Sequence, residues 1–172
     1  MILGMSTETF TLIHVLISLV GIGSGLVALY GWITARSLDG WTTLFLWSTV
    51  LTSVTGFLFP ITKVTPGLIL GGISLVVLAL ALVAKYMQHL AGGWRRIFVI
   101  TSVAALYFNV FVAVVQSFEK IPALHALAPK GNEPPFAVAQ LIVLVAFVWL
   151  GWKAVKGFSI ASAVRPVSVK AA

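Results

Sequence analysis

The stretch YFNVFVAVVQSF, residues 107–118, is almost wholly apolar, yet it carries the amides Asn109 and Gln116. It closes an apolar run of residues 95–118, and a helix needs about 20 such residues, at about 1.5 Å each, to cross a bilayer. The two amides are seven residues apart, close to two helical turns, so they share one face of this helix. An amide that faced lipid would have no hydrogen-bond partner. We therefore expect this face to point into a helical bundle.

The composition of the whole chain indicates the same environment. Hydrophobic residues make up 60% of the 172 residues and charged residues only 9%, too few to cover the surface of a soluble protein. The net charge is +7, but Lys and Arg lie in short segments between apolar runs and not on one face of a soluble domain. This distribution argues against a nucleic-acid partner and predicts contact with the lipid bilayer.

Apolar runs of membrane-spanning length predict an all-α integral membrane helical bundle with five transmembrane helices. Residues that start helices separate the runs, including Asp39 before the second run and Thr65 with Pro66 before the third. No region alternates in the pattern of a membrane β-barrel. The predicted spans are residues 10–33, 41–60, 66–90, 95–118 and 136–157.

The positive-inside rule orients this bundle, because cytoplasmic segments of membrane proteins are enriched in Lys and Arg. A cytoplasmic C-terminus puts eight basic residues inside and three outside, which predicts an N-out/C-in orientation. Five of the six tryptophans then fall at the inner ends of their spans, where Trp side chains prefer the membrane interface. The inner basic residues are Arg36, Lys85, Arg95, Arg96, Lys153, Lys156, Arg165 and Lys170, and the outer ones are Lys63, Lys120 and Lys130.

The long connection of residues 119–135 is expected on the outer side. Pro122 can start a helix and Pro129 must end it, so we expect one short helix lying in the membrane interface. Residues 1–157 then form a single transmembrane domain. Residues 158–172 have too little apolar content to pack and are expected to form a flexible cytoplasmic tail.

Four polar side chains form the candidate site, because counting along the helices places them together in the outer half of the bundle. In one interpretation they hydrogen-bond across helices and fix the packing, each contributing about 0.6 kcal/mol. In the other they line a cavity open to the outer face that holds a small hydrophobic molecule, a lipid head group or a quinone-like ring. These residues are His14, Asn109, Gln116 and Gln140.

His14 shares a helical face with Gly21 and Gly25, which form a GxxxG pattern that permits close approach of a neighbouring helix. A redox protein that binds b-type haem or quinone near His14 is one alternative function. Bis-histidine haem would need a second histidine on a facing helix. His89 lies at the inner end of the third span, and His125 lies in the outer loop, so neither obviously provides it.

Other chemistries lack the residues that they require. The chain has no cysteine, which excludes disulfides and thiolate metal sites, and no acidic residue lies within a predicted span. No catalytic motif or metal-ligand spacing occurs, so the sequence assigns no catalytic residue, no metal and no named cofactor. A small transporter or channel is a second alternative and needs a polar path across both halves. At the inner end, Trp94, Arg95 and Arg96 are predicted to contact lipid head groups.

The segment FNVFVAVVQSFEKIPALHALAPKGNEPPFAVAQ, residues 108–140, resembles the closing region of a group of small, uncharacterised multi-pass proteins of bacterial inner membranes. The resemblance covers the last two spans and their loop, and the first span only loosely. It implies a bacterial cytoplasmic membrane and carries over no catalytic residue. With the residue pattern, it leads us to expect a non-enzymatic integral membrane protein. This protein would be an accessory subunit or a binder of a small hydrophobic ligand or lipid, as a homo-oligomer or within a larger membrane complex.

Overall fold

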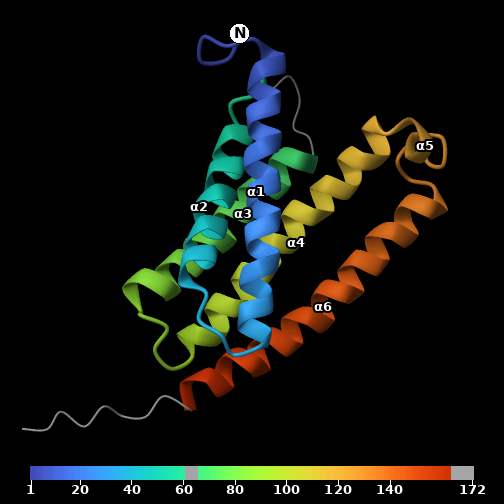
Figure 1. The fold of residues 1–172 in the computed structure, drawn as a ribbon. Coiled ribbons are helices and arrows are strands. Elements are labelled where there is room, and N and C mark those ends of the chain that lie inside the picture. The colour runs from blue at the N-terminus through green and yellow to red at the C-terminus, as the bar shows by residue number, and fades with distance from the viewer. Residues whose placement is uncertain (61–65, 164–172) are drawn as a thin grey trace, which may run out of the picture.

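The structure, a computed structural model, describes residues 1–60 and 66–163, with side chains described for residues 1–60 and 67–158. These residues form helices joined by short connections, and no strand forms among them (Figure 1). The all-α prediction is confirmed. The helices are α1 (Thr7–Ile33), α2 (Asp39–Gly56), α3 (Pro66–Leu82), the π-helix η1 (Val83–Met87), α4 (Trp94–Lys120), α5 (Pro122–His125) and α6 (Pro134–Ala163).

Among the described residues, four stretches of helix are long and apolar enough to cross a membrane, and not the predicted five. The prediction that residues 41–60 form a membrane-spanning helix is therefore wrong. Its helix α2 ends at Gly56 after 18 residues, and seven of these are Ser or Thr, which lower its hydropathy. The chain is thus a multi-pass helical membrane protein. Its four apolar stretches are Thr7–Ile33, Gly67–Met87, Trp94–Lys120 and Pro134–Phe158.

Helix α2 runs antiparallel beside α1 and packs closely against it (Figure 1). It returns the chain to the end at which α1 starts, so Thr7 and the last turn of α6 lie at opposite ends of the molecule. We call the end that carries residues 34–38 and 88–96 the basic end. The N-out/C-in prediction rested on an odd number of crossings and on charge. The four apolar stretches do not supply that odd number, although α2 still leaves the start of α1 and the last turn of α6 at opposite ends, and the orientation stays a prediction. The described basic residues of this end are Arg36, Lys85, Arg95, Arg96, Lys153 and Lys156.

Side-chain chemistry sets where the helices begin. The Ser6 hydroxyl accepts a hydrogen bond from the Thr9 backbone N–H at 3.1 Å and caps α1, which starts three residues before the predicted position 10. Pro66 and Pro134 occupy the first positions of α3 and α6, where a helix does not use the N–H that proline lacks. The predicted cap Thr65 lies outside the described residues.

The third predicted span ends in a wide turn. At Val83, α3 passes into η1, a turn of π-helix in which backbone hydrogen bonds span five residues. The Leu90 N–H then bonds to the Ala84 carbonyl at 3.0 Å, and His89 and Leu90 take left-handed φ values of 49° and 57°. The helix therefore stops at Met87 and not at residue 90, and the chain turns towards α4.

The buried core lies towards the basic end. Trp32 meets Phe45 and Phe98 edge to face there, with ring centroids 6.3 and 5.5 Å apart. Trp32 is only 2% exposed, so it packs in the core and does not contact the membrane interface as expected. Fully buried alanines allow the helices to approach one another closely, and these are Ala28, Ala81, Ala84, Ala105 and Ala154.

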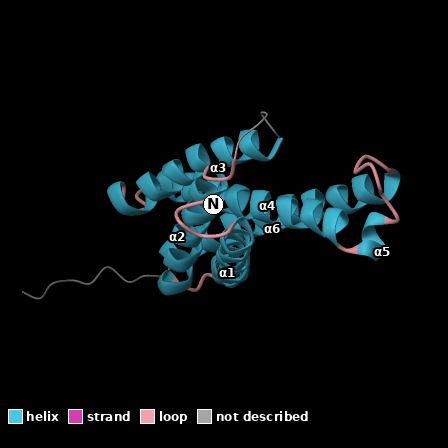
Figure 2. Ribbon diagram, turned by 90° about the horizontal axis from the view of Figure 1, so that it is seen from above, coloured by secondary structure: helices cyan, strands magenta, loops and turns pink. Residues whose placement is uncertain are grey.

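Helices α4 and α6 form a hairpin whose outer part leaves the bundle. Ring contacts between Phe118 and Phe136 and between Tyr107 and Phe147 join the two helices. Away from the basic end, both lean away from α1, α2 and α3, with α5 at the tip (Figures 1 and 2). The buried residues of α4 accordingly fall between Phe98 and Leu106, and beyond them only Phe118 is buried. We call residues 107–147 the arm.

The loop of the arm agrees with the prediction that its prolines made. A short helix, α5, starts at Pro122 and ends at His125, before Pro129. The structure shows this helix but does not include a bilayer interface, so its interfacial position stays a prediction. The predicted tail begins inside α6, which continues as helix to Ala163. The remaining residues, 164–172, lie outside the described part of the chain.

Candidate functional site

A row of hydroxyl side chains on α2 provides hydrogen-bonding partners inside the bundle. Thr49, Thr52 and Thr55 follow one another at a three-residue spacing, which keeps them near one helical face. Inside a membrane protein, such groups satisfy polar side chains of facing helices. These threonines were not singled out from the sequence, although their regular spacing is a readable signal.

His14 of α1 bonds to Thr55 of α2. The imidazole Nδ1 lies 2.8 Å from Thr55 Oγ1. The Thr55 hydroxyl has a single hydrogen, which it donates to the Leu51 carbonyl at 2.6 Å. The Leu51 bond favours the tautomer in which Nδ1–H donates to Thr55, and in that tautomer the neutral imidazole keeps Nε2 as an acceptor. No donor from the described part of the chain bonds to Nε2.

One aromatic ring packs against this histidine, and a second ring packs against the first. The centroid of the Phe59 ring lies 5.3 Å from that of His14, edge to face, and the Phe10 ring contacts Phe59 at 5.0 Å. His14 is half-buried and lies in the second turn of α1, at the end opposite the basic end. A hydrogen-bond acceptor is thus held in an apolar, partly open setting.

Asn109 joins α4 to α2 at the point where the arm begins. Its Nδ2 donates a hydrogen bond to Thr49 Oγ1 at 3.2 Å. Gly21 of α1 leaves room for this contact, because a Cβ added there would lie 3.3 Å from Thr49 Oγ1 and 3.4 Å from Asn109 Nδ2. The amide therefore points into the bundle, as the periodicity of residues 107–118 predicts.

Thr52 lies on α2 between these two hydrogen-bonded pairs. Its Oγ1 is buried and has no hydrogen-bond partner among the described residues. Leaving a buried hydroxyl without a partner costs about 1–3 kcal/mol, so a water or a ligand hydroxyl would be favoured beside it. We call the set His14, Thr55, Thr52, Thr49 and Asn109 the polar seam.

The other two predicted site residues lie apart from the polar seam. Gln116 is exposed, and its Nε2 donates to Glu119 Oε2 of the same helix at 3.1 Å. Gln140 Nε2 donates to the Phe111 carbonyl at 3.2 Å and ties α6 to α4 within the arm. The structure thus brings His14 and Asn109 to one row of α2 hydroxyls and gives both glutamines partners in the arm.

The polar seam stops before the basic end. Gly25 of α1 faces Leu106 and Phe45, and an added Cβ would lie 2.6 and 2.7 Å from their side chains. Both of these side chains are fully buried, and Trp32 packs against Phe45 beneath them. The GxxxG pattern was expected to let a neighbouring helix approach closely, whereas the atoms nearest to Gly21 and Gly25 belong to side chains of α2 and α4. This packing closes the seam and weighs against the transporter and channel alternatives.

Neither of the other histidines lies beside His14. His89 follows η1 at the basic end, and His125 ends α5 at the tip of the arm (Figure 1). In the described ranges, no three His, Cys, Asp or Glu side chains gather where they could hold a metal ion. The described residues therefore do not form the bis-histidine haem arrangement, and His14 is better suited to accept a hydrogen bond.

At the basic end, the predicted head-group residues open α4. Arg95 Cζ lies 5.7 Å from the centroid of the Phe158 ring of α6, within the range of a cation–π contact. Arg96 is exposed and Trp94 is half-buried. All three lie at one end of the apolar stretch of α4, where head groups would meet them, and their lipid contact stays a prediction.

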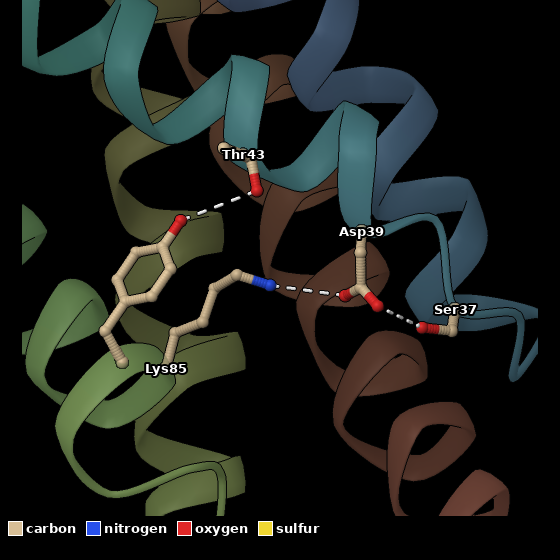
Figure 3. A network of polar contacts seen from close by, with 5 residues as sticks. Ser37, Asp39, Thr43 and Lys85 are labelled. Atoms are coloured by element: carbon tan, nitrogen blue, oxygen red, sulfur yellow. Dashed lines mark hydrogen bonds and ion pairs between the residues drawn. The ribbon is translucent and has the colours of Figure 1, made fainter.

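The same end carries a network that links α2 to the end of η1. Lys85 Nζ donates to Asp39 Oδ1 at 3.2 Å, and the Ser37 hydroxyl donates to Asp39 Oδ2 at 2.9 Å (Figure 3). Thr43 Oγ1 and Tyr86 Oη lie 3.5 Å apart beside this pair. The ammonium of Lys85, one of the basic residues predicted on the inner side, is thus held by a carboxylate of the protein.

Comparison with known proteins finds no match among protein-family models, curated proteins or solved structures. These comparisons identify no family, and of the resemblance suggested by residues 108–140 the structure supports only the multi-pass helical membrane shape.

Proposed function

We propose that this chain is a non-enzymatic membrane protein that binds a small hydrophobic ligand at the polar seam, as an accessory component of its membrane. His14 carries the proposal. Its Nδ1–H is engaged by Thr55, while its Nε2 lone pair receives no hydrogen bond from the described residues. An acceptor that stands among phenylalanine rings suits a ligand with an apolar body and one polar group.

The protonation of His14 defines the polar group of the ligand. Because Nε2 accepts, its partner is a donor, such as the hydroxyl of a quinol-like ring or of a lipid head group. The carbonyl oxygen of a quinone is itself an acceptor, so it could not form a hydrogen bond with the Nε2 lone pair. The buried Thr52 hydroxyl, without a partner in the described chain, supports a second hydrogen bond if its side chain turns towards the ligand.

The arm supports a route from the bilayer to the polar seam. Beyond Asn109, α4 is mostly half-buried or exposed, since the arm leans away from α1, α2 and α3 (Figure 2). A molecule dissolved in the hydrocarbon core therefore approaches His14 sideways and need not leave the membrane. This agrees with a hydrophobic ligand and not with a water-soluble one.

We further propose that the protein lies in a bacterial cytoplasmic membrane with the basic end in the cytoplasm. Six described Lys and Arg residues belong to this end, against Lys120 and Lys130 at the other. The chain has no cysteine, so single cysteines introduced at Ala91 and at Lys130 report the two sides. An impermeant maleimide added to intact cells should label position 130 and spare position 91, and the reverse pattern would refute the orientation.

The ligand proposal is tested by His14→Asn. The Asn amide keeps a donor close to the place of Nδ1 and so preserves the bond to Thr55, but it removes the Nε2 acceptor. We expect a short-chain benzoquinol to bind the wild-type protein in nanodiscs saturably, and His14→Asn to bind it about tenfold more weakly, the worth of one hydrogen bond. His89→Asn, at the basic end, is the matched control and should bind as the wild type does. Equal binding by all three proteins, or no binding to the wild type, would leave the polar seam with a packing role.

A further inference from the structure

One face of α6 is largely exposed. Residues at a spacing of three or four share this face, and Leu141, Val145, Trp149 and Trp152 on it are between 53% and 60% exposed. The opposite face, which carries Phe147 and Ala154, is buried against the bundle. In a bilayer, the exposed face meets lipid along its whole length.

The chemistry of this face changes from apolar to basic towards the basic end. Its first part forms an open hollow of about 490 Å³, and the next turns carry two pairs of Trp and Lys. Lys153 Nζ lies 4.0 Å from the centroid of the Trp149 ring, and Lys156 Nζ lies 3.7 Å from that of Trp152. Both lysines therefore fold back over the indoles towards the hollow. The hollow is lined by Leu141, Ile142, Val145, Ala146 and Trp149.

The two lysines have no acidic partner nearby. Helix α6 contains no Asp or Glu. Within the described residues, the salt bridge of the molecule joins Lys85 to Asp39 and does not involve α6. The positive charge of Lys153 and Lys156 is thus open to an anion from outside the protein. Trp149 and Trp152 place the pair at the level of the head groups, where interfacial tryptophans lie.

We propose that this face of α6 is a binding site for one anionic phospholipid. Lys153 and Lys156 hold the phosphate, the indoles of Trp149 and Trp152 lie beside the glycerol region, and an acyl chain fills the hollow. From Trp149 to Leu141 the helix rises about 12 Å, close to the ~15 Å thickness of one hydrocarbon leaflet. Charge and length therefore match the two parts of the same lipid molecule.

A second copy of this chain is the competing occupant of the face. A dimer with its two-fold axis along the bilayer normal would bring Lys153 and Lys156 of both copies together, and these like charges would repel each other. A lipid phosphate neutralises the same charges. The charge pattern favours the lipid.

The test is native mass spectrometry of the purified full chain, titrated separately with phosphatidylglycerol and phosphatidylcholine. We expect phosphatidylglycerol to bind more tightly, and the double variant Lys153→Gln/Lys156→Gln to weaken its binding by about tenfold or more while phosphatidylcholine binding stays unchanged. Lys153→Arg/Lys156→Arg should retain binding, because it keeps both charges. Lys120→Gln/Lys130→Gln removes two charges at the opposite end and is the matched control.

Three results would overturn the proposal. They are equal affinity of the wild-type protein for the two lipids, unchanged phosphatidylglycerol binding in Lys153→Gln/Lys156→Gln, and equal losses in that variant and in the control at the opposite end. A dimer that persists without lipid and dissociates when Val145 is replaced by Trp would assign the face to a second copy. The outcome is independent of ligand binding at the polar seam, because His14→Asn leaves this face unaltered.

Discussion

Lys85 Nζ lies 3.2 Å from Asp39 Oδ1, and this ion pair joins η1 to the first turn of α2. The Lys85 side chain is only 12% exposed, whereas that of Asp39 is 75% exposed, so a largely covered lysine reaches a carboxylate at the surface. The carboxylate also lies at the N-terminus of α2, where the helix dipole favours a negative charge. Both effects hold the end of the third span against the start of α2.

Replacing Asp39 with Asn should therefore destabilise the protein modestly. The pair is mostly open to solvent on the Asp39 side, so its coupling energy should be about 0.2–1 kcal/mol. A double-mutant cycle with Lys85→Met, read from thermal unfolding in detergent, measures this coupling, which should shrink at high salt. Lys130→Met removes an exposed charge at the opposite end and should have little effect. Fully additive single effects would show that the pair contributes nothing.

Gly157→Ala should separate α6 from the end of α1. An added Cβ would clash with the backbone carbonyl oxygens of Ile33 and Trp32, the latter only 2.6 Å away, and backbone atoms cannot rotate aside. Overpacking of this kind costs about 1–3 kcal/mol. Gly23→Ala is the matched control, because nothing lies within 4 Å of its added Cβ and alanine favours the helix. The unfolding temperature should fall for the first variant and hold or rise for the second, and the opposite ranking would contradict the packing described here.

The bond between Asn109 and Thr49 should be measurable as a coupling between α4 and α2. Hydrogen bonds between membrane helices contribute about 0.6 kcal/mol, so Asn109→Leu and Thr49→Val together should cost less than the sum of their separate effects. Equilibrium unfolding in mixed micelles supplies the three free energies. Gln116→Leu, whose amide bonds within its own helix, should show no coupling to Thr49→Val. Coupling of equal size there would mean that the effect is not specific to the Asn109 contact.

Glu133 should give the turn before α6 a dependence on acid pH. Partial burial opposes ionisation of the carboxyl, but the backbone N–H groups of Lys130 and Asn132, 3.0 and 3.1 Å from its oxygens, outweigh this and lower its pKa. Because the folded pKa is lowered, the stabilisation is present above the ordinary value near 4.5 and is lost as pH falls through the lower, folded pKa.

Carbon NMR of a Glu-labelled sample should therefore find the Glu133 titration below the ordinary value. In Glu133→Gln, the amide resonances of Lys130 and Asn132 should no longer shift when the sample is acidified. A midpoint at or above 4.5 would show that the backbone contacts do not hold the carboxylate.

Helix positions could be predicted because apolar length and helix-starting residues are local properties. Pro66 marks the start of α3, and Pro122 marks the start of α5. The number of membrane-spanning helices could not be predicted as well. The second run is bounded like the others, but its hydroxyl residues make α2 a helix that hydrogen-bonds to its neighbours and lies below the hydropathy of the other four. The wide turn at η1 has no signal in the pattern that we analysed.

For the candidate site, too, only the properties of single helices could be predicted. Helical periodicity turned both Asn109 and Gln116 inward, and Asn109 does contact Thr49 of α2, but Gln116 is exposed. His14 lies at the end opposite the basic end, as the depth count expected. Depth along the helices could not predict whether Gln116 and Gln140 lie beside His14 and Asn109. Two side chains at equal depth can lie on helices that diverge. The arm is such a divergence (Figure 2). Its angle depends on packing between distant segments, which a count along one chain does not contain.

The π-helical turn sets the direction, around the helix axis, in which the side chains after it point. A π-turn holds about one residue more than an α-turn, and one residue corresponds to about 100° of rotation about the helix axis. Deleting a single residue within Val83–Met87 would let the segment relax into regular α-helix and swing the following side chains round the axis. When the deleted residue precedes Lys85, the Lys85 side chain would then turn away from Asp39 and the ion pair would be lost. Homologous chains that lack this inserted residue should therefore also lack an acidic group at the position of Asp39.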